Sequence, residues 1–243
     1  MSSNATEERF TDFKCPYCGF SASFPDTHNG TAQDCPNCLE SVVVPESSSE
    51  YGGKFPIPIR TQLLILRQLK TGDEQDLREL MLDEDSFRYI DWHPLDEADI
   101  ERWLEVERSA RLTHSGGHLC LGVETTDSSK LIGFVSLYFT DDDHRQAGFT
   151  TMISRSFRRR GYGTEAVCGA FDFAFTGINV RRLAVGCDSR NTAACGMLEK
   201  AGMRREGEFV KDRYVKGEWT STVWFGLLNE EYEARREPPR KPK

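Results

Sequence analysis

The most informative stretch of this sequence is Arg158-Arg159-Arg160-Gly161-Tyr162-Gly163-Thr164-Glu165-Ala166. It follows an apolar, strand-like run at 149–153 and opens an apolar, helix-like run at 166–175. A helix start leaves backbone N–H groups without partners, and its dipole favours anions. Glycine lets the backbone approach a ligand closely, and arginine offers a planar pair of donors to phosphate oxygens. The stretch therefore predicts a phosphate-binding site.

The rest of the central sequence predicts a mixed α+β domain. Asp73 and Asp96 are predicted to cap two helices whose apolar positions recur at helical spacing. The expected strands are 61–70, 119–125, 131–139, 148–153, 182–187, 207–215 and 220–228, and two further helices are expected at 162–176 and 192–201.

Arg158-x-x-Gly161-x-Gly163 matches the acyl-CoA signature of the GNAT N-acetyltransferases, so the chain resembles that family. The surrounding motifs resemble one branch, the enzymes that acetylate N-terminal α-amines of ribosomal proteins. These motifs are Leu66 to Leu69 with 73–82 (opening strand and first helix), Trp92-His93-Pro94, Leu131-Ile132-Gly133, Asn191 to Met203, and Leu227 to Tyr232 (a terminal strand).

The resemblance implies the GNAT acyl-CoA N-acyltransferase fold, a mixed central sheet flanked by helices that holds acetyl-CoA where its middle strands diverge. It also implies which residues contact the cofactor: the backbone of Met152 and Ile153 for the pantetheine arm, Arg158, Arg159, Arg160, Gly161, Tyr162, Gly163 and Thr164 for the diphosphate, and Asn191. Asn191 is also a good helix N-cap residue, and both roles can hold together.

The usual acid and base of the family are not visible in the sequence. Leu198 stands where many members have a tyrosine acid, Ala194 where the ribosomal branch often has serine, and Gln146 or Ala147 where a carboxylate often lies. The catalytic residues therefore stay unknown, with Cys195, Ser189 and His144 as nearby candidates.

The expected reaction is acetyl transfer from acetyl-CoA to a primary amine, with the α-amine of a protein or peptide as the favoured acceptor. An α-amine has a reference pKa of about 7.7–8.0, whereas deprotonating a lysine amine at pH 7 costs about 4.6 kcal/mol. An active site without a strong base therefore favours an α-amine over a lysine side chain as the acceptor. Two alternatives stay open: a small amine such as a polyamine or aminoglycoside, and an acyl-CoA sensor that has lost catalysis.

Four cysteines near the N-terminus form two Cys-Pro-x-Cys pairs, Cys15 with Cys18 and Cys35 with Cys38, separated by sixteen residues. This spacing predicts a zinc ribbon, because four thiolates complete the tetrahedral shell of a structural Zn²⁺ ion. A module of this size cannot bury a sufficient core, so the metal supplies its folding free energy. Iron and an unmetallated state are the alternatives. The other cysteines, Cys120, Cys168, Cys187 and Cys195, are expected to pack as small apolar residues.

Composition and charge complete the sequence-based expectations. The net charge of −8 argues against nucleic-acid and membrane-surface binding, and no apolar run is long enough to span a bilayer. A polar N-terminus favours a cytoplasmic location. We divide the chain into a zinc ribbon (10–45), a flexible linker (46–60), a GNAT domain (61–234) and a disordered tail (235–243). The sequence does not fix the oligomeric state or the partner of the ribbon.

Overall fold

The computed structural model describes residues 10–14, 21–25, 32–35, 41–43, 57–110, 118–141 and 145–236. Its N-terminal part contains two antiparallel hairpins, β1 (Phe10–Lys14) with β2 (Ser21–Pro25) and β3 (Ala32–Asp34) with β4 (Ser41–Val43). Cys35 directly follows β3 and is buried. The other predicted zinc ligands, Cys15, Cys18 and Cys38, lie outside the described residues, as does the catalytic candidate His144. Within the described residues, no group of three or more His, Cys, Asp or Glu side chains is arranged to hold a metal ion.

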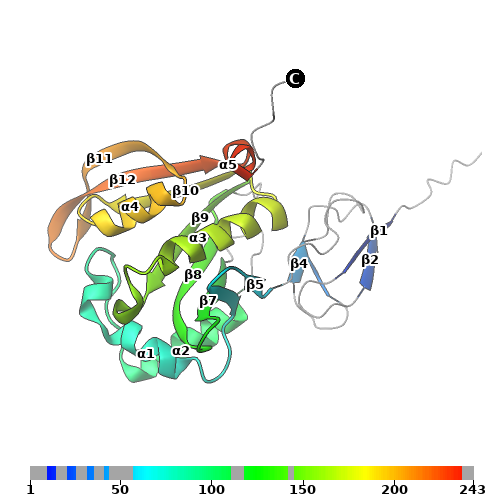
Figure 1. The fold of residues 1–243 in the computed structure, drawn as a ribbon, viewed down its shortest axis with the longest axis horizontal. Coiled ribbons are helices and arrows are strands. Elements are labelled where there is room, and N and C mark those ends of the chain that lie inside the picture. Colours follow the sequence, from blue (N-terminus) through cyan, green and yellow to red (C-terminus); the bar gives the residue numbers. More distant parts are fainter. Residues whose placement is uncertain are drawn as a thin grey trace, which may run out of the picture.

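An eight-stranded sheet forms the centre of the molecule, in the order β11-β12-β10-β9-β8-β7-β6-β5 (Figure 1). Its strands are β5 (Ile59–Arg60), β6 (Leu64–Gln68), β7 (His118–Thr125), β8 (Leu131–Phe139), β9 (Gln146–Ile153), β10 (Arg182–Asp188), β11 (Arg204–Val215) and β12 (Glu218–Leu228). Every neighbouring pair is antiparallel except β9 and β10, which are parallel. Because β5 belongs to this sheet, the domain begins slightly before the predicted boundary at residue 61.

The parallel pair marks a branch in the sheet. Strands β9 and β10 pair only at their first residues, Gln146 with Arg182 and Ala147 with Leu183. Beyond this point β9 stays with β8 and β10 stays with β12. The sheet therefore opens into two arms, which diverge in Figure 1.

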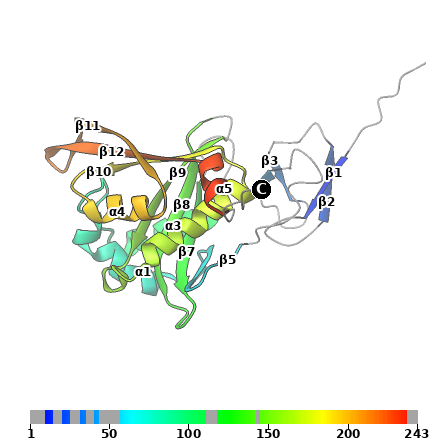
Figure 2. The ribbon, with the colours of Figure 1, turned by 45° about the horizontal axis from the view of Figure 1, so that its top comes forward.

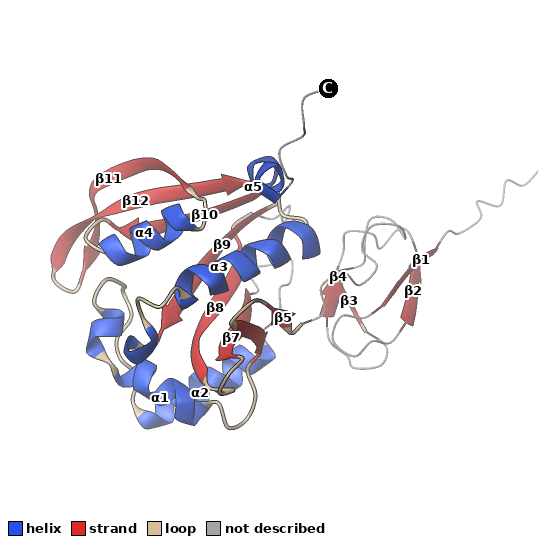
Figure 3. Cartoon of the chain, in the orientation of Figure 1, coloured by secondary structure: helices blue, strands red, loops and turns tan. Residues whose placement is uncertain are grey.

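Two helices, α1 (Glu74–Leu82) and α2 (Glu97–Ser109), cover one face of the sheet (Figure 3). The apolar residues of α1 predicted from the sequence, Leu77, Leu80 and Met81, are buried as expected. They pack with Phe134 of β8 in one of two apolar clusters. At the start of α2, the Asp96 carboxylate accepts a hydrogen bond from the Asp99 N–H, which confirms the predicted cap.

The opposite face is covered by α3 (Tyr162–Asp172), a π-helical turn (Phe173–Gly177), α4 (Thr192–Lys200) and α5 (Asn229–Arg236), as Figure 2 shows from a second side. Val167 of α3 and Leu198 of α4 contribute to the larger apolar cluster, together with Leu121 and Val135 of the sheet. Residues that alternate along β7 and β8 thus serve opposite faces, as the two-residue period of a strand requires.

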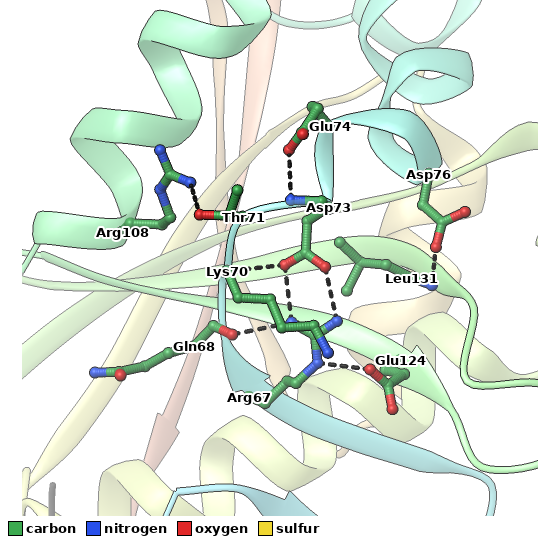
Figure 4. Close-up of polar contacts among 11 residues, drawn as sticks. Arg67, Gln68, Lys70, Thr71, Asp73, Glu74, Asp76, Arg108, Glu124 and Leu131 are labelled. Carbon is green, nitrogen blue, oxygen red and sulfur yellow. Dashed lines mark hydrogen bonds and ion pairs between the residues drawn. The ribbon is translucent and has the colours of Figure 1, made fainter.

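The predicted cap at Asp73 is wrong. Asp73 occupies the N-cap position of α1 without making a side-chain cap bond. Its buried carboxylate instead accepts two bonds of 2.8 Å from the guanidinium of Arg67 and one of 2.7 Å from the Lys70 N–H (Figure 4). Arg67 also donates from Nε to Glu124 at 2.6 Å. A buried guanidinium needs carboxylate partners, and this need outweighs the preference of Asp73 for capping.

The C-terminal end of the domain also differs from the prediction. Residues 229–232, which resemble a terminal strand, begin the helix α5, and this helix extends to Arg236. Tyr232 stacks on Phe175 with a ring separation of 4.9 Å and donates to Asp172, so α5 is fixed against the end of α3. In the described part of the chain, no helix has the length and apolar character needed to cross a bilayer.

Candidate active site

The branch exposes one edge of β9. The Ser154 N–H donates to the carbonyl oxygen of Ile132 in β8, so residues 132 and 154 form a hydrogen-bonded pair across the two strands. Such pairs alternate along an antiparallel ladder. The backbone of Met152 therefore bonds Phe134 of β8, whereas the backbones of Thr151 and Ile153 point towards the opening between the arms. The strand register thus directs the backbone of Thr151, rather than that of Met152, towards the opening, which the sequence alone did not predict.

The loop after β9 ends in a helix start that is open to an anion. Gly161 adopts φ +88°, a left-handed conformation that favours glycine, and it precedes the first residue of α3, Tyr162. No side chain caps this helix start. The N–H groups of its first turn, including those of Gly163 and Thr164, point out of the helix without intrahelical acceptors. The predicted phosphate loop therefore has the required backbone geometry.

The arginines of the loop have different roles. Arg158 donates from Nε to the Ile153 carbonyl at 2.8 Å and from a terminal nitrogen to Ser86. Its guanidinium also lies 3.6 Å from Asp85 and 3.8 Å from Asp83. Arg158 thus joins the loop to the segment after α1, which is a positioning role that the sequence did not predict. Arg155, Arg159 and Arg160 are exposed, and Arg160 lies over the Phe157 ring at 5.6 Å.

The acidic residue in the first turn of α3, Glu165, is bonded to another element of the fold. The Glu165 carboxylate accepts bonds of 2.6 Å from the Thr61 hydroxyl and from the Leu63 N–H. It therefore fastens α3 to the turn between β5 and β6. Because these bonds fix the carboxylate at that turn, the first turn of α3 keeps its positive end for a ligand.

On the other arm, Asn191 caps α4. Its side-chain oxygen accepts from the Ala194 N–H at 3.1 Å, which agrees with the capping interpretation. The Cys187 thiol of β10 donates to the Asp188 carbonyl at 3.6 Å, and burial, followed by the neighbouring Cys195, raises the pKa of Cys187. Ser189 bonds β12 through its N–H, which donates to the Ser221 carbonyl at 2.9 Å. Both catalytic candidates, Cys195 and Ser189, thus lie on the β10–α4 arm in contacts that hold the fold.

An open cavity of about 650 Å³ lies beside the loop. Its lining carries both signs of charge, and consists of Asp83, Glu84, Asp85, Arg88, His93, Pro94, Arg155 and Lys216. Lys216, at the turn between β11 and β12, donates to the Phe87 carbonyl and so connects this hairpin to the segment after α1. His93 and Pro94 belong to the Trp-His-Pro motif noted in the sequence, but the acidic and basic lining was not predicted.

A sheet that divides into two arms, with an uncapped helix start at the open end of the division, is the arrangement expected of a protein that binds a phosphate-bearing cofactor. The family model described as "Acetyltransferase (GNAT) domain" matches residues 64–204, which is more than half of the chain. The chain belongs to the GNAT acetyltransferase family. It is an N-acetyltransferase that uses acetyl-CoA as cosubstrate and an amine as acceptor.

Three relatives illustrate the range of named activities. The N-acetyltransferase YnaD of Bacillus subtilis is 25% identical over 72% of this chain and 98% of its own length. Spermidine N(1)-acetyltransferase of Escherichia coli is 28% identical over 44% of this chain and 58% of its own. YdaF of Bacillus subtilis, described as a candidate ribosomal N-acetyltransferase, is 27% identical over 44% of this chain and 58% of its own length.

Solved structures agree on the fold. A GNAT-family acetyltransferase from Bacillus anthracis superposes with a TM-score of 0.65 at 22% identity, covering 71% of this chain and 98% of that one. The spermidine N-acetyltransferase from Vibrio cholerae, solved with CoA and spermine, gives a TM-score of 0.60 at 22% identity, covering 70% and 98%. These structures share the architecture with this chain, while the relatives differ in their named acceptors.

Proposed function

We propose that the acceptor is the α-amine of a protein or peptide. The observation that carries the proposal is the mixed charge of the cavity beside the loop, where Arg88, Arg155 and Lys216 accompany three acidic residues. A peptide N-terminus offers an ammonium group to carboxylates and carbonyl oxygens to cationic donors. A polyamine carries only positive charge, so three cations in the same cavity repel it.

The chemistry of the amine supports the same acceptor. An α-amine with a pKa of about 7.7–8.0 is partly neutral at pH 7, so it needs no strong base to become nucleophilic. The carboxylate that the family often places on the cofactor strand is absent here, since Gln146 and Ala147 stand in its place. The candidate ribosomal activity named for YdaF is a further point in favour.

We also propose how the cofactor is held. The first turn of α3, from Gly161 to Thr164, binds the diphosphate through its N–H groups, and the exposed arginines of the loop supply positive charge. The pantetheine arm follows the free edge of β9 at Thr151 and Ile153. Asn191 contacts the cofactor from the start of α4 while it caps that helix.

Spermidine is the second candidate acceptor, favoured by the named relative and by Asp83, Glu84 and Asp85 in the cavity. Thiol release from acetyl-CoA distinguishes the two. We expect kcat/KM to be at least ~10-fold higher for a peptide with a free N-terminal alanine or serine than for spermidine. The same peptide with a blocked N-terminus and an internal lysine serves as the control, and it should not react.

A charge reversal in the cavity sharpens this comparison. Arg88→Glu should raise KM for the peptide and lower KM for spermidine, because it removes a cation that repels the polyamine. Higher activity with spermidine in the unchanged enzyme, together with no peptide turnover, would assign the polyamine as acceptor instead.

For the N-terminal module, we propose that Cys15, Cys18, Cys35 and Cys38 bind one structural Zn²⁺ ion and that the ribbon recognises a protein partner. The buried Cys35 and the position of each cysteine pair in the sequence, between the two strands of a hairpin, fit this site. Metal analysis of the intact chain should find about one zinc per chain. Cys35→Ser should lose it, whereas Cys168→Ser, which changes an exposed cysteine of α3, should keep it. Iron in place of zinc, or no metal, would contradict the proposal.

A further inference from the structure

One tyrosine of β8 lies over the point where the sheet branches. Tyr138 is the cross-strand partner of Gly148, which is the first residue of β9 beyond its last partner in β10. A Cβ atom at Gly148 would lie only 2.5 to 2.8 Å from the ring and the hydroxyl oxygen of Tyr138. The absence of a side chain at Gly148 therefore lets the phenol of Tyr138 lean across β9.

The side chain that interacts with the hydroxyl of this tyrosine belongs to β9. It is Thr150, two residues after Gly148 and thus on the same face of the sheet. Burial, partly offset by Thr150, raises the pKa of Tyr138, so the phenol keeps its proton and acts as a donor. Thr150 and Tyr138 are both half-buried, so neither side chain is enclosed in the core.

The path of the cofactor places its sulfur near this pair. A pantetheine arm that starts at the first turn of α3 and follows β9 runs from Ile153 back towards Gly148. At about 3.3 Å per residue this stretch measures about 17 Å, which an extended pantetheine arm can span. The thioester then lies beside the branch, where the hydroxyl of Tyr138 is held.

Two other ionisable groups near Tyr138 are paired or buried. His118, its cross-strand partner on β7, is paired through Nε2 with Glu107 of α2 at 2.8 Å. Cys120 is buried, and this burial, followed by the charge of Glu107, raises the pKa of its thiol. Of His118, Cys120 and Tyr138, it is Tyr138 whose side chain lies against β9, where it can donate a proton.

We propose that Tyr138, whose phenol lies over Gly148, donates a proton to the thiolate of CoA as it departs. The amine nitrogen attacks the carbonyl carbon, the C–N bond forms and the C–S bond breaks. The sulfur takes the phenolic proton, and the phenolate regains one from the new amide nitrogen. The products are the amide and free CoA, and no further reactant is needed. This assignment fills the acid position that Leu198 leaves empty. It rests on the cofactor path proposed above and is independent of the acceptor.

Kinetics of Tyr138→Phe give the first test, because phenylalanine keeps the ring over Gly148 and removes only the hydroxyl. With acetyl-CoA and either the alanine-initiated peptide or spermidine, we expect kcat to fall at least ~100-fold, as for other general acids, while KM for acetyl-CoA changes less than threefold. Tyr232→Phe is the matched control, since it removes a hydroxyl bonded to Asp172 at a distance from the branch. Its kcat should remain within twofold. A kcat within threefold of the unchanged enzyme for Tyr138→Phe would overturn the proposal.

Binding of CoA and desulfo-CoA gives a second test that needs no acceptor. At pH 9 part of the CoA thiol is ionised, and a hydrogen bond from Tyr138 to the thiolate is charge-assisted. Calorimetry should show CoA binding about tenfold more tightly than desulfo-CoA to the unchanged protein, and the preference should fall at least fivefold in Tyr138→Phe. An equal preference in both proteins would show that Tyr138 does not touch the sulfur, whatever the acceptor is.

Discussion

Gly163→Asp lowers the affinity for acetyl-CoA at least ~100-fold. A Cβ at residue 163 points towards Met197 Sδ, at 3.1 Å, and towards Ile153, at 3.8 Å, so a side chain there enters the proposed cofactor path. Its carboxylate takes the positive end of α3 and repels the diphosphate. The loss corresponds to one or two charge-assisted hydrogen bonds, each about 1.5–3 kcal/mol.

The fold should survive this change. A negative charge in the first turn of a helix is favourable, and the flexible Met197 side chain can move by the few tenths of an ångström required. Gly163→Asn is the matched control, because it has the same shape without the charge, and it should lose much less affinity. If calorimetry finds the aspartate variant within fivefold of the unchanged protein, the diphosphate does not bind at this helix start.

Arg67→Met should lower the free energy of unfolding by about 3–5 kcal/mol, since it leaves two buried carboxylates without their cation. The Arg67 side chain is 14% exposed, and those of its partners Asp73 and Glu124 are 4% and 11% exposed. The hydrogen bonds that Arg67 donates to Asp73 and Glu124 outweigh burial and raise the pKa of Arg67, so the guanidinium stays charged. Figure 4 shows how this group ties β6, the start of α1 and β7 together.

Urea unfolding followed by tryptophan fluorescence measures this loss. The control is Arg78→Met, because Arg78 and its partner Glu97 are 46% and 58% exposed and their ion pair should contribute at most about 1 kcal/mol. Removing the carboxylates as well, in Arg67→Met with Asp73→Asn and Glu124→Gln, should recover part of the lost stability. Equal effects of Arg67→Met and Arg78→Met would mean that burial of the ion pair has no energetic consequence.

Local patterns in the sequence predicted much of the fold and part of the site. The spacing of Leu77, Leu80 and Met81 was enough to place the buried face of α1, and the glycine pattern located the start of α3 at Gly161. Both features depend on residues that are close in the chain. For the same reason the Asp96 and Asn191 caps agree with the structure.

Features that depend on contacts between residues far apart in the chain could not be predicted from the sequence. The partners of Arg158 lie more than seventy residues earlier in the chain, at Asp83 to Ser86, so its role in holding the loop has no local signal. Thr151 faces the opening only because of the register between β8 and β9. The same register places Tyr138 opposite Gly148, and the lack of a side chain at Gly148 lets the Tyr138 ring lie over β9.

The most direct test of the central claim is a crystal structure of the intact chain with CoA bound. We predict that the diphosphate oxygens lie about 2.7–3.2 Å from the N–H groups of the first turn of α3, and that the pantetheine arm follows β9 at Thr151 and Ile153. Density for the diphosphate at any other place, with the start of α3 in contact only with water, would contradict the account.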